Sequence, residues 1–217
     1  MQNKLSQIIF VVILITNCCM INAQVDNEKL SKGLVDISLF IINHDFGDQA
    51  DLEKIDIIYS FALEYFENDY SEALLALTFA CLPFQEMPLR LPVINVPINL
   101  GLPTIEKELF KKKLKNIPSH FLIHSPKSNF GDKDKVSHFF GNAFIKYNFE
   151  YFQFASFMGA FVELFEGTFK IDGAVDERDL YINKFGELFG KLLNENPEIL
   201  PSRVLSLDAL NYIIISR

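Results

Sequence analysis

The chain has 217 residues, 49% of them hydrophobic and 22% charged, and its formal net charge is −8. This composition is typical of a folded globular protein and excludes an intrinsically disordered chain, and the length suits one domain with a substantial core. The acidic balance argues against a nucleic-acid-binding protein, because neutralising phosphates requires a basic surface.

The first 23 residues have the layout of a secretory signal peptide. Lys4 precedes the apolar run IIFVVILI, and small and polar residues follow as far as Ala23. A charged start, a short apolar middle and a small residue at the cleavage site are the marks of such a signal. The apolar middle is too short for a comfortable transmembrane span. We therefore expect cleavage after Ala23 and export to the periplasm, either free there or associated with the outer membrane.

Two of the three cysteines lie in this segment. Cys18 and Cys19 leave a lipoprotein as an alternative, in which a cysteine becomes the acylated first residue, although neither follows the small residue that such processing prefers. Cleavage after Ala23 would remove both cysteines and Lys4, so that the net charge would fall from −8 to −9. The remaining Cys81 cannot form an internal disulfide, and we expect it to be a small buried hydrophobic residue.

Apolar residues spaced three and four apart predict helices in residues 24–82, the first part of the mature chain. The pattern covers residues 26–43, residues 50–67 and the stretch NDYSEALLALTFACL. Either Asp69 or Ser71 would cap the third of these helices, because each has a side-chain oxygen that can accept from free backbone N–H groups.

The connector, residues 83–130, changes in character. Four prolines fall within residues 88–103, which excludes both a helix and a central strand. An irregular two-stranded ribbon that turns near Ile94 and Asn95 fits this pattern best. The ribbon would either cover the helical core or reach a partner, and covering agrees better with the rarity of exposed apolar ribbons.

A short amphipathic helix follows in the connector, in the stretch TIEKELFKKKLKN. We expect Thr104 to cap it and Pro118 to end it. Its lysines alternate with Phe110 and Leu114, which indicates a solvated helix face rather than a basic binding patch.

Residues 131–195 carry polar and glycine residues at helical spacing in three apolar segments. Residues four apart lie on one face of a helix, so each segment presents a narrow stripe, and we expect the stripes to meet. Asp132 would cap the first helix, and Gly186 and Gly190 form a small-xxx-small pair that lets another helix approach closely. The stripe residues are Asp134, His138 and Asn142 in the first segment, Gly159, Glu163 and Glu166 in the second, and Asp179, Asn183, Gly186 and Gly190 in the third.

Glu163 lies in the most apolar of these segments, residues 150–166. An isolated carboxylate there would be expensive to desolvate, so it needs a hydrogen-bond donor. His138 is the first candidate for that donor and Asn183 the second. We expect His138, Glu163 and Asp179 to lie close to one another.

The stretches DKVSHFF, GAFVELFEG and RDLYINKFGELFG, in this order, resemble the DKxxHF … GxxxE … DLxxNxxG pattern of VanZ-like and YfiM-type bacterial envelope proteins. The resemblance covers residues 131–190 and implies a place in the cell envelope rather than a particular reaction. VanZ-like proteins are similar to multi-span membrane proteins, whereas here Lys146, Glu150, Gln153 and Glu166 interrupt the apolar runs. We therefore expect a soluble or surface-associated form. By position the pattern marks Asp134, Lys135, His138, Gly159, Glu163, Asp179, Asn183 and Gly186.

Two classes of function fit these residues. The sequence contains no GxSxG, HExxH, P-loop, dinucleotide-binding glycine fingerprint or zinc-type Cys/His spacing. This favours a non-enzymatic envelope protein without cofactor or metal, whose polar cluster fixes helix packing. The alternative is a metal-dependent or acid–base enzyme or binding protein acting on a lipid or cell-wall component. One imidazole and two carboxylates (His138, Glu163 and Asp179) are able to ligate a divalent cation or to serve as an acid–base pair.

The apolar ribbon and the carboxy-terminal segment, residues 196–217, suggest contact with a membrane surface or another envelope protein. Apolar residues alternate in the last part of that segment, which predicts either a short terminal strand or a tail docked on the helices. The sequence does not decide between these two, and it does not indicate the oligomeric state. In total the sequence predicts a mainly α protein with one domain, residues 24–217. This domain is a helical bundle with a proline-rich ribbon.

Overall fold

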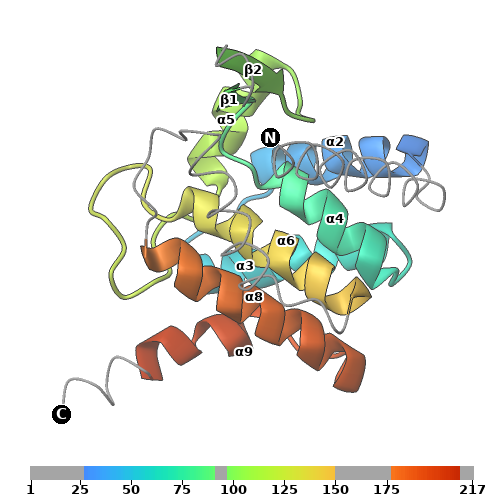
Figure 1. Ribbon diagram of the computed structural model, residues 1–217, viewed down its shortest axis with the longest axis vertical. Helices are drawn as coiled ribbons and strands as arrows, with labels where there is room; N and C mark the ends of the chain where they lie inside the picture. Colours follow the sequence, from blue (N-terminus) through green and yellow to red (C-terminus); the bar gives the residue numbers. More distant parts are fainter. Residues whose placement is uncertain (1–26, 91–96, 150–176, 211–217) are drawn as a thin grey trace, which may run out of the picture.

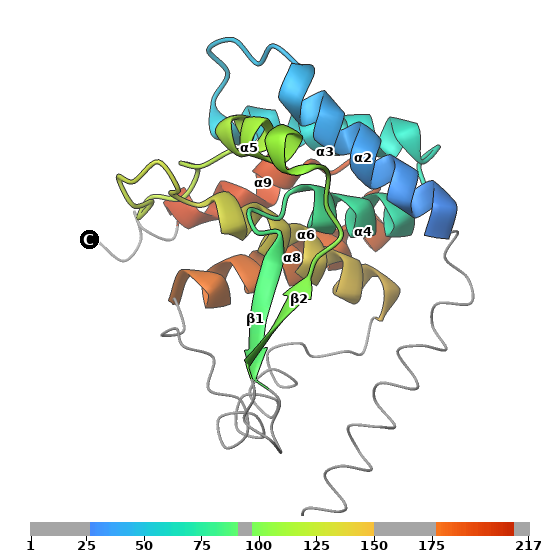
Figure 2. The same ribbon diagram turned by 90° about the horizontal axis from the view of Figure 1, so that it is seen from above.

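The computed structural model describes residues 27–90, 97–149 and 177–210. Over these ranges the protein is mainly helical, which confirms the predicted fold class, and a two-stranded antiparallel ribbon extends from the helices (Figures 1 and 2). None of the described helices is both long enough and apolar enough to cross a membrane. The helices are α2 (Asn27–Asn43), α3 (Asp51–Tyr65), α4 (Tyr70–Ala80), α5 (Lys107–Asn116), α6 (Lys133–Asn148), α8 (Glu177–Glu195) and α9 (Pro201–Leu205), and the strands are β1 (Glu86–Arg90) and β2 (Pro97–Gly101).

The first three described helices form where the apolar spacing predicts them. Asp69 caps α4, one of the two predicted alternatives, because its side chain accepts a 3.0 Å hydrogen bond from the backbone N–H of Glu72. Between α3 and α4 the chain reverses through Glu67 and Asn68, whose φ angles of 56° and 66° are left-handed. Asparagine adopts this conformation more readily than most residues, so the tight reversal is partly encoded locally.

The core is formed by residues of α2, α3, α4, α6, α8 and α9. Tyr59 of α3 stacks on Phe140 of α6, with 6.2 Å between ring centroids, and Phe189 of α8 contacts both Tyr59 and Phe139 at 5.4 and 5.2 Å. Cys81, at the end of α4, is fully buried and free, so its predicted role as a small buried hydrophobic residue is confirmed. Aromatic rings from three helices thus fix the apolar side of α6, and its polar side is left to meet α8.

The ribbon pairs β1 with β2 in antiparallel register, from Glu86 opposite Gly101 to Arg90 opposite Pro97. This agrees with the predicted two-stranded ribbon, although it begins two residues earlier than predicted. The predicted turn at Ile94 and Asn95 lies outside the described residues. Figures 1 and 2 show the ribbon extending away from the described helices, so it does not cover them.

Helix α5 differs from its prediction at both its start and its lysine face. It begins at Lys107 with Glu106 at the cap position. The hydroxyl of Thr104 is buried without a hydrogen-bond partner among the described residues, so the predicted cap is wrong. Lys113 is 0% exposed, and its ammonium donates to the backbone oxygens of Ala80 (2.7 Å) and Leu82 (3.2 Å). The last carbonyls of a helix have no partner within that helix and carry partial negative charge. Their hydrogen bonds to the ammonium explain how Lys113 is stabilised in the interior.

A second side chain of α5 acts in the same way on another helix. The amide nitrogen of Asn116 donates to the carbonyl oxygens of Ile41 (2.9 Å) and Ile42 (3.2 Å), near the end of α2. Helix α5 therefore closes the carboxyl ends of both α2 and α4. This explains how a helix with mostly polar residues packs firmly on the body of the protein.

The described part of the carboxy-terminal segment is helical. Helix α9 packs with buried Val204 and Leu205 against the body, below α8 in Figure 1, and Asp56 of α3 accepts a 2.8 Å hydrogen bond from the backbone N–H of Ser202. Residues 207–210 are also helical. A strand is therefore absent through residue 210, the docked-tail alternative holds for this part, and the alternating stretch after it lies outside the described residues.

Candidate functional site

Helices α6 and α8 lie side by side (Figures 1 and 2), and two glycines of α8 allow their backbones to touch. A Cβ atom on Gly186 would overlap the carbonyl oxygen of Phe139 and lie 2.8 Å from Cβ of Asn142. A Cβ atom on Gly190 would overlap the carbonyl oxygen of Ala143. The two glycines thus have the close-contact role that their spacing predicts, and they position the polar residues of both helices.

Lys135 forms the buried centre of the polar residues between the two helices. Its side chain is 2% exposed, and its ammonium forms ion pairs with Asp134, at 2.8 Å, and with Asp179 of α8. Burial alone would lower the pKa of Lys135, but the hydrogen bonds and charges of the two carboxylates outweigh burial and raise the pKa above its ordinary value. The lysine is therefore a firmly held cation that links the helices.

His138 lies at the solvent side of this centre, with its side chain 41% exposed. Its Nδ1 lies 3.3 Å from Oδ1 of Asn183, and its Nε2 lies 3.9 Å from Oδ1 of Asp179. The amide nitrogen of Asn142 donates to the same Asn183 oxygen at 2.8 Å and to the backbone oxygen of His138 at 2.7 Å. Asn183 of α8 therefore contacts the imidazole directly, and Asn142 of α6 holds Asn183 in that position.

We call the residues Asp134, Lys135, His138, Asn142, Asp179 and Asn183 the polar cluster. The structure brings these six predicted residues together, as the meeting of the stripes requires. Glu163, the seventh predicted member, and Gly159 and Glu166 lie outside the described residues, so the expected contact between Glu163 and His138 is not described. The central place of Lys135 was not predicted from the residues themselves, because a lysine in the first turn of a helix has the appearance of a surface charge.

Asp132 provides a second polar link between α6 and α8, and it does not act as the predicted helix cap. It is 0% exposed, and its Oδ1 accepts a 2.8 Å hydrogen bond from Arg178 of α8. Its Oδ2 accepts from the backbone N–H groups of Phe121 (3.2 Å) and Leu122 (3.1 Å) and from the hydroxyl of Ser125. The four donors to this carboxylate come from the preceding loop and from α8, and the carboxylate accepts no hydrogen bond from the start of α6.

Gly131 allows that loop to approach α6. Its φ of 53° is left-handed, and a Cβ atom there would overlap the carbonyl oxygen of Ser119, which accepts a 2.7 Å hydrogen bond from the backbone N–H of Asp132. Asp51 of α3 holds the same loop, because its Oδ2 accepts from the N–H groups of Ser119 and His120 at 2.7 Å each. Residues 119–132 are therefore tied down at the amino-terminal end of the polar cluster. The sequence offered no signal for these partners, which are far apart along the chain.

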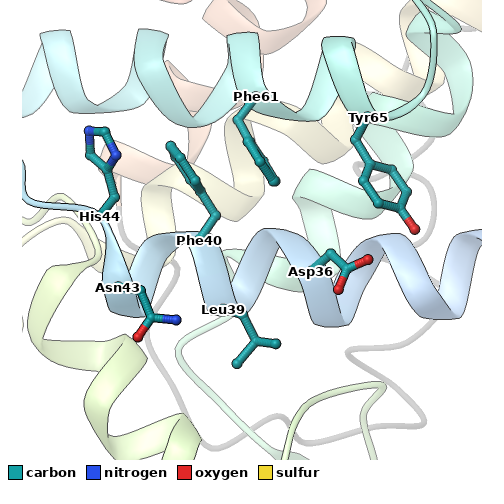
Figure 3. Close-up of a pocket in the computed structure, with 7 residues that line it drawn as sticks. All are labelled: Asp36, Leu39, Phe40, Asn43, His44, Phe61 and Tyr65. Atoms are coloured by element: carbon teal, nitrogen blue, oxygen red, sulfur yellow. The ribbon is translucent and has the colours of Figure 1, made fainter.

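An open groove of about 470 Å³ between α2 and α3 is a second candidate (Figure 3). Phe40 and Phe61 stack across its centre at 4.0 Å, and Figure 3 shows His44 on one side of them and Asp36 with Tyr65 on the other. Partial burial, and then the hydrogen bond to Asp36, raise the pKa of Tyr65. The acid and the imidazole do not converge on one point, so the groove offers apolar contact rather than chemistry. Its lining consists of Asp36, Leu39, Phe40, Asn43, His44, Phe61 and Tyr65.

The polar cluster is therefore the better candidate for a functional site. An accessible imidazole and two carboxylates lie within 4.8 Å of one another there, and a buried ammonium pairs with both carboxylates. Such a combination is able to bind a cation or transfer a proton, as well as to link helices. Comparison of the chain with protein-family models, with curated proteins and with solved structures finds no match.

Proposed function

We propose that the protein is an exported, non-enzymatic component of a bacterial cell envelope, in which the polar cluster locks α6 to α8. The observation that carries this proposal is the position of Lys135. Its ammonium is buried between Asp134 and Asp179 and forms ion pairs with both. A carboxylate oxygen that already accepts from a buried ammonium is a poor general base, because that oxygen is not free to take a proton from a substrate.

The composition of the cluster supports the same conclusion. It contains no serine, threonine or cysteine that would act as a nucleophile with the imidazole. The amide nitrogen of Asn142 donates to Oδ1 of Asn183, and this hydrogen bond joins the two helices. The two glycines of α8 add close backbone contact beside them. Each feature serves the attachment of α8 to α6, and none of them requires a substrate.

The envelope location is supported by the signal-like residues 1–23 and by the resemblance of residues 131–190 to VanZ-like and YfiM-type proteins. Contact with a membrane surface or another envelope protein belongs to the same proposal. Its support is an exposed aromatic pair next to the ribbon, because Phe84 and Phe130 are 48% and 41% exposed and their ring centroids lie 5.8 Å apart.

A double-mutant cycle tests the locking role. Lys135→Met should lower the free energy of unfolding by about 2 kcal/mol, because two facing carboxylates lose their shared cation. Asp179→Asn should cost less, and the double variant should lose about 1 kcal/mol less than the sum of the two single losses. Urea unfolding in the presence of EDTA measures all four proteins.

The control for this cycle is the exposed pair of Lys111 and Glu108 on α5, which are also linked at 2.8 Å. Surface pairs of this kind contribute little, so a cycle of Lys111→Met with Glu108→Gln should show no measurable coupling. Strictly additive losses for Lys135 and Asp179 would mean that their ion pair does not hold the helices together, and the proposed function would fail.

Cell fractionation tests the location. In a bacterium that expresses the full chain, we expect the protein in the periplasmic fraction or released from membranes by a carbonate wash. Its amino-terminal residue should be Gln24, because cleavage is expected after Ala23. Mass spectrometry would identify that residue, and would equally detect an acyl group on Cys18 or Cys19. An intact chain beginning at Met1 in the cytoplasmic fraction would contradict export.

A further inference from the structure

We infer that Asp134, His138 and Asp179 form a binding site for a divalent first-row transition-metal ion, which takes the place of the Lys135 ammonium between the two carboxylates. The inference concerns the same polar cluster as the proposed function and adds a ligand to it. It makes no claim of catalysis, because a metal ion that bridges α6 and α8 would lock the helices as the lysine does.

The spacing of the three side chains suits one ion. One ligand atom from each of Asp134, His138 and Asp179 can be chosen so that all three lie within 4.8 Å of one another. Two ligand atoms bound to one ion at about 2.1 Å are separated by roughly 3 to 4.2 Å. The three side chains therefore need to close by only about half an ångström, which rotation of a carboxylate provides.

The hydrogen bonds around His138 direct its free nitrogen to this point. A backbone oxygen only accepts, so the Asn142 atom that faces the His138 carbonyl is the amide nitrogen. This nitrogen also donates to Asn183, so the Asn183 atom beside the imidazole is an oxygen. The Nδ1 of His138 must then carry the proton that it donates to that oxygen. In the neutral imidazole Nε2 keeps its lone pair, and it faces Asp179.

This arrangement places two groups with negative or partial negative charge opposite one another. The Nε2 lone pair and Oδ1 of Asp179 are 3.9 Å apart, beyond hydrogen-bond distance. A positive ion between them would turn the repulsion into two bonds. A histidine that donates its other ring N–H to an oxygen is also the usual arrangement behind a metal-bound imidazole, because that bond fixes the ring and its tautomer.

Asp134, the third of these side chains, has an unused acceptor. Its Oδ2 pairs with Lys135, but its Oδ1 is buried and has no hydrogen-bond partner among the described residues. A buried acceptor without a partner costs free energy that a bound cation would recover. Asp134 therefore offers the ion one oxygen that no described donor occupies, in addition to the oxygen that Lys135 holds.

The burial of the cluster defines a path for the ion. His138 is 41% exposed, Asp179 26% and Asp134 18%, whereas Lys135 is 2% exposed. An ion from solvent would meet the imidazole first and the ammonium last. Because Lys135 carries charge of the same sign and pairs with both carboxylates, it competes with the ion. The competition should make binding to the wild-type protein weaker than the ligand set alone would give.

The ligand chemistry selects the class of metal. One imidazole nitrogen with two carboxylate oxygens suits Zn²⁺, Mn²⁺ or Fe²⁺, whereas Mg²⁺ and Ca²⁺ prefer sites made of oxygen atoms only. Zn²⁺ is the convenient probe because it accepts three protein ligands with water in the fourth position.

Isothermal titration of the EDTA-treated and dialysed full chain with Zn²⁺ tests the inference. We expect one Zn²⁺ per chain, binding at least about tenfold weaker in His138→Ala, and at least about tenfold tighter in Lys135→Met, where the competing ammonium is gone. The matched control is His120→Ala, because His120 is an exposed histidine outside the cluster, and its affinity should equal that of the wild type. Mg²⁺ should give no comparable heat.

Equal Zn²⁺ affinity of the wild type and His138→Ala would overturn the inference, and so would a folded Lys135→Met variant that binds no tighter than the wild type. If Lys135→Met does not fold in EDTA, added Zn²⁺ should restore its helical circular dichroism, and failure to do so would count equally against the site. The unfolding cycle in EDTA is independent of this result. Coupling between Lys135 and Asp179 without Zn²⁺ binding would support the proposed function and contradict the metal site. Zn²⁺ binding without that coupling would support the metal site and contradict the proposed function.

Discussion

Replacing Gly186 with alanine should lower the free energy of unfolding by about 3 kcal/mol, although alanine is the better helix former by about 1 kcal/mol. The added Cβ atom would overlap the Phe139 carbonyl oxygen, which is part of the α6 backbone. Backbone cannot rotate away as a side chain can, so α6 and α8 must separate. Separation would also stretch the hydrogen bond between Asn142 and Asn183. Urea unfolding measures the loss of free energy. In a thermal melt, the midpoint temperature should fall by roughly 6 to 12 °C.

The matched control for this substitution is Gly141→Ala on α6. A Cβ atom there would lie 3.2 Å from Cγ2 of Thr78, the end of a side chain rather than backbone. A small adjustment of Thr78 and the gain in helix propensity should nearly cancel, so this variant should remain within about 1 kcal/mol of the wild type. Equal effects of the two substitutions would mean that the backbone contact at Gly186 is not tight.

Lys113→Met should remove a rise in stability at alkaline pH. Burial lowers the pKa of Lys113 from 10.5 to about 8, and Cys81 opposes this only weakly. Between these two values the unfolded chain binds more protons than the folded chain, so the wild type gains stability as pH rises through this window. Below about pH 8 both states are charged and the full cost of burying the ammonium remains. Relative to Lys113→Met, the wild type should gain about 2 kcal/mol from pH 7 to pH 10.

Comparison with the variant is needed because other groups titrate in the same range. Burial also raises the pKa of Tyr59, which lowers stability at high pH in both proteins and cancels in the difference. Burial raises the pKa of Cys81 too, and the charge of Lys113 opposes that shift, so the measured difference includes the interaction between Lys113 and Cys81. The control is Lys111→Met, which removes an exposed lysine from the same helix and should show no pH-dependent difference from the wild type. Parallel curves for the wild type and Lys113→Met in urea would show that the ammonium is not buried in the folded protein.

Helical spacing predicted the elements well because it depends on neighbours in sequence. An apolar residue every third or fourth position fixes which face of a helix is buried, so α2, α3, α4, α6 and α8 lie where their patterns place them. The same rule predicted that Asp134, His138 and Asn142 share a face, as do Asp179 and Asn183. The glycines at Gly186 and Gly190 then indicated which face of α8 a neighbour would approach.

The partners of the charged residues depend on tertiary structure, and the sequence did not reveal them. Lys113 has the spacing of a surface residue, yet it ends against a carbonyl oxygen 33 residues away in sequence. Asp132 has the position of a helix cap, but its carboxylate accepts hydrogen bonds from Arg178 and from the preceding loop instead of from the start of α6. Lys135 likewise has the sequence context of a first-turn charge. In each case local preference identifies the residue type, and only the fold determines what it contacts.

The glycine contacts of α8 have a geometric consequence for the polar cluster. Asp179, Asn183, Gly186 and Gly190 follow one stripe of α8, at steps of four, three and four residues. In the carboxyl half of the stripe the residues are glycines, and the α8 backbone contacts the α6 backbone directly. In its amino half, side chains such as that of Lys135 lie between the two helices. Backbone contact at the glycines therefore holds α6 and α8 together at one half of the stripe, and side chains fill the space between them at the other half. Two residues without functional groups thus set how closely the groups of the polar cluster face one another.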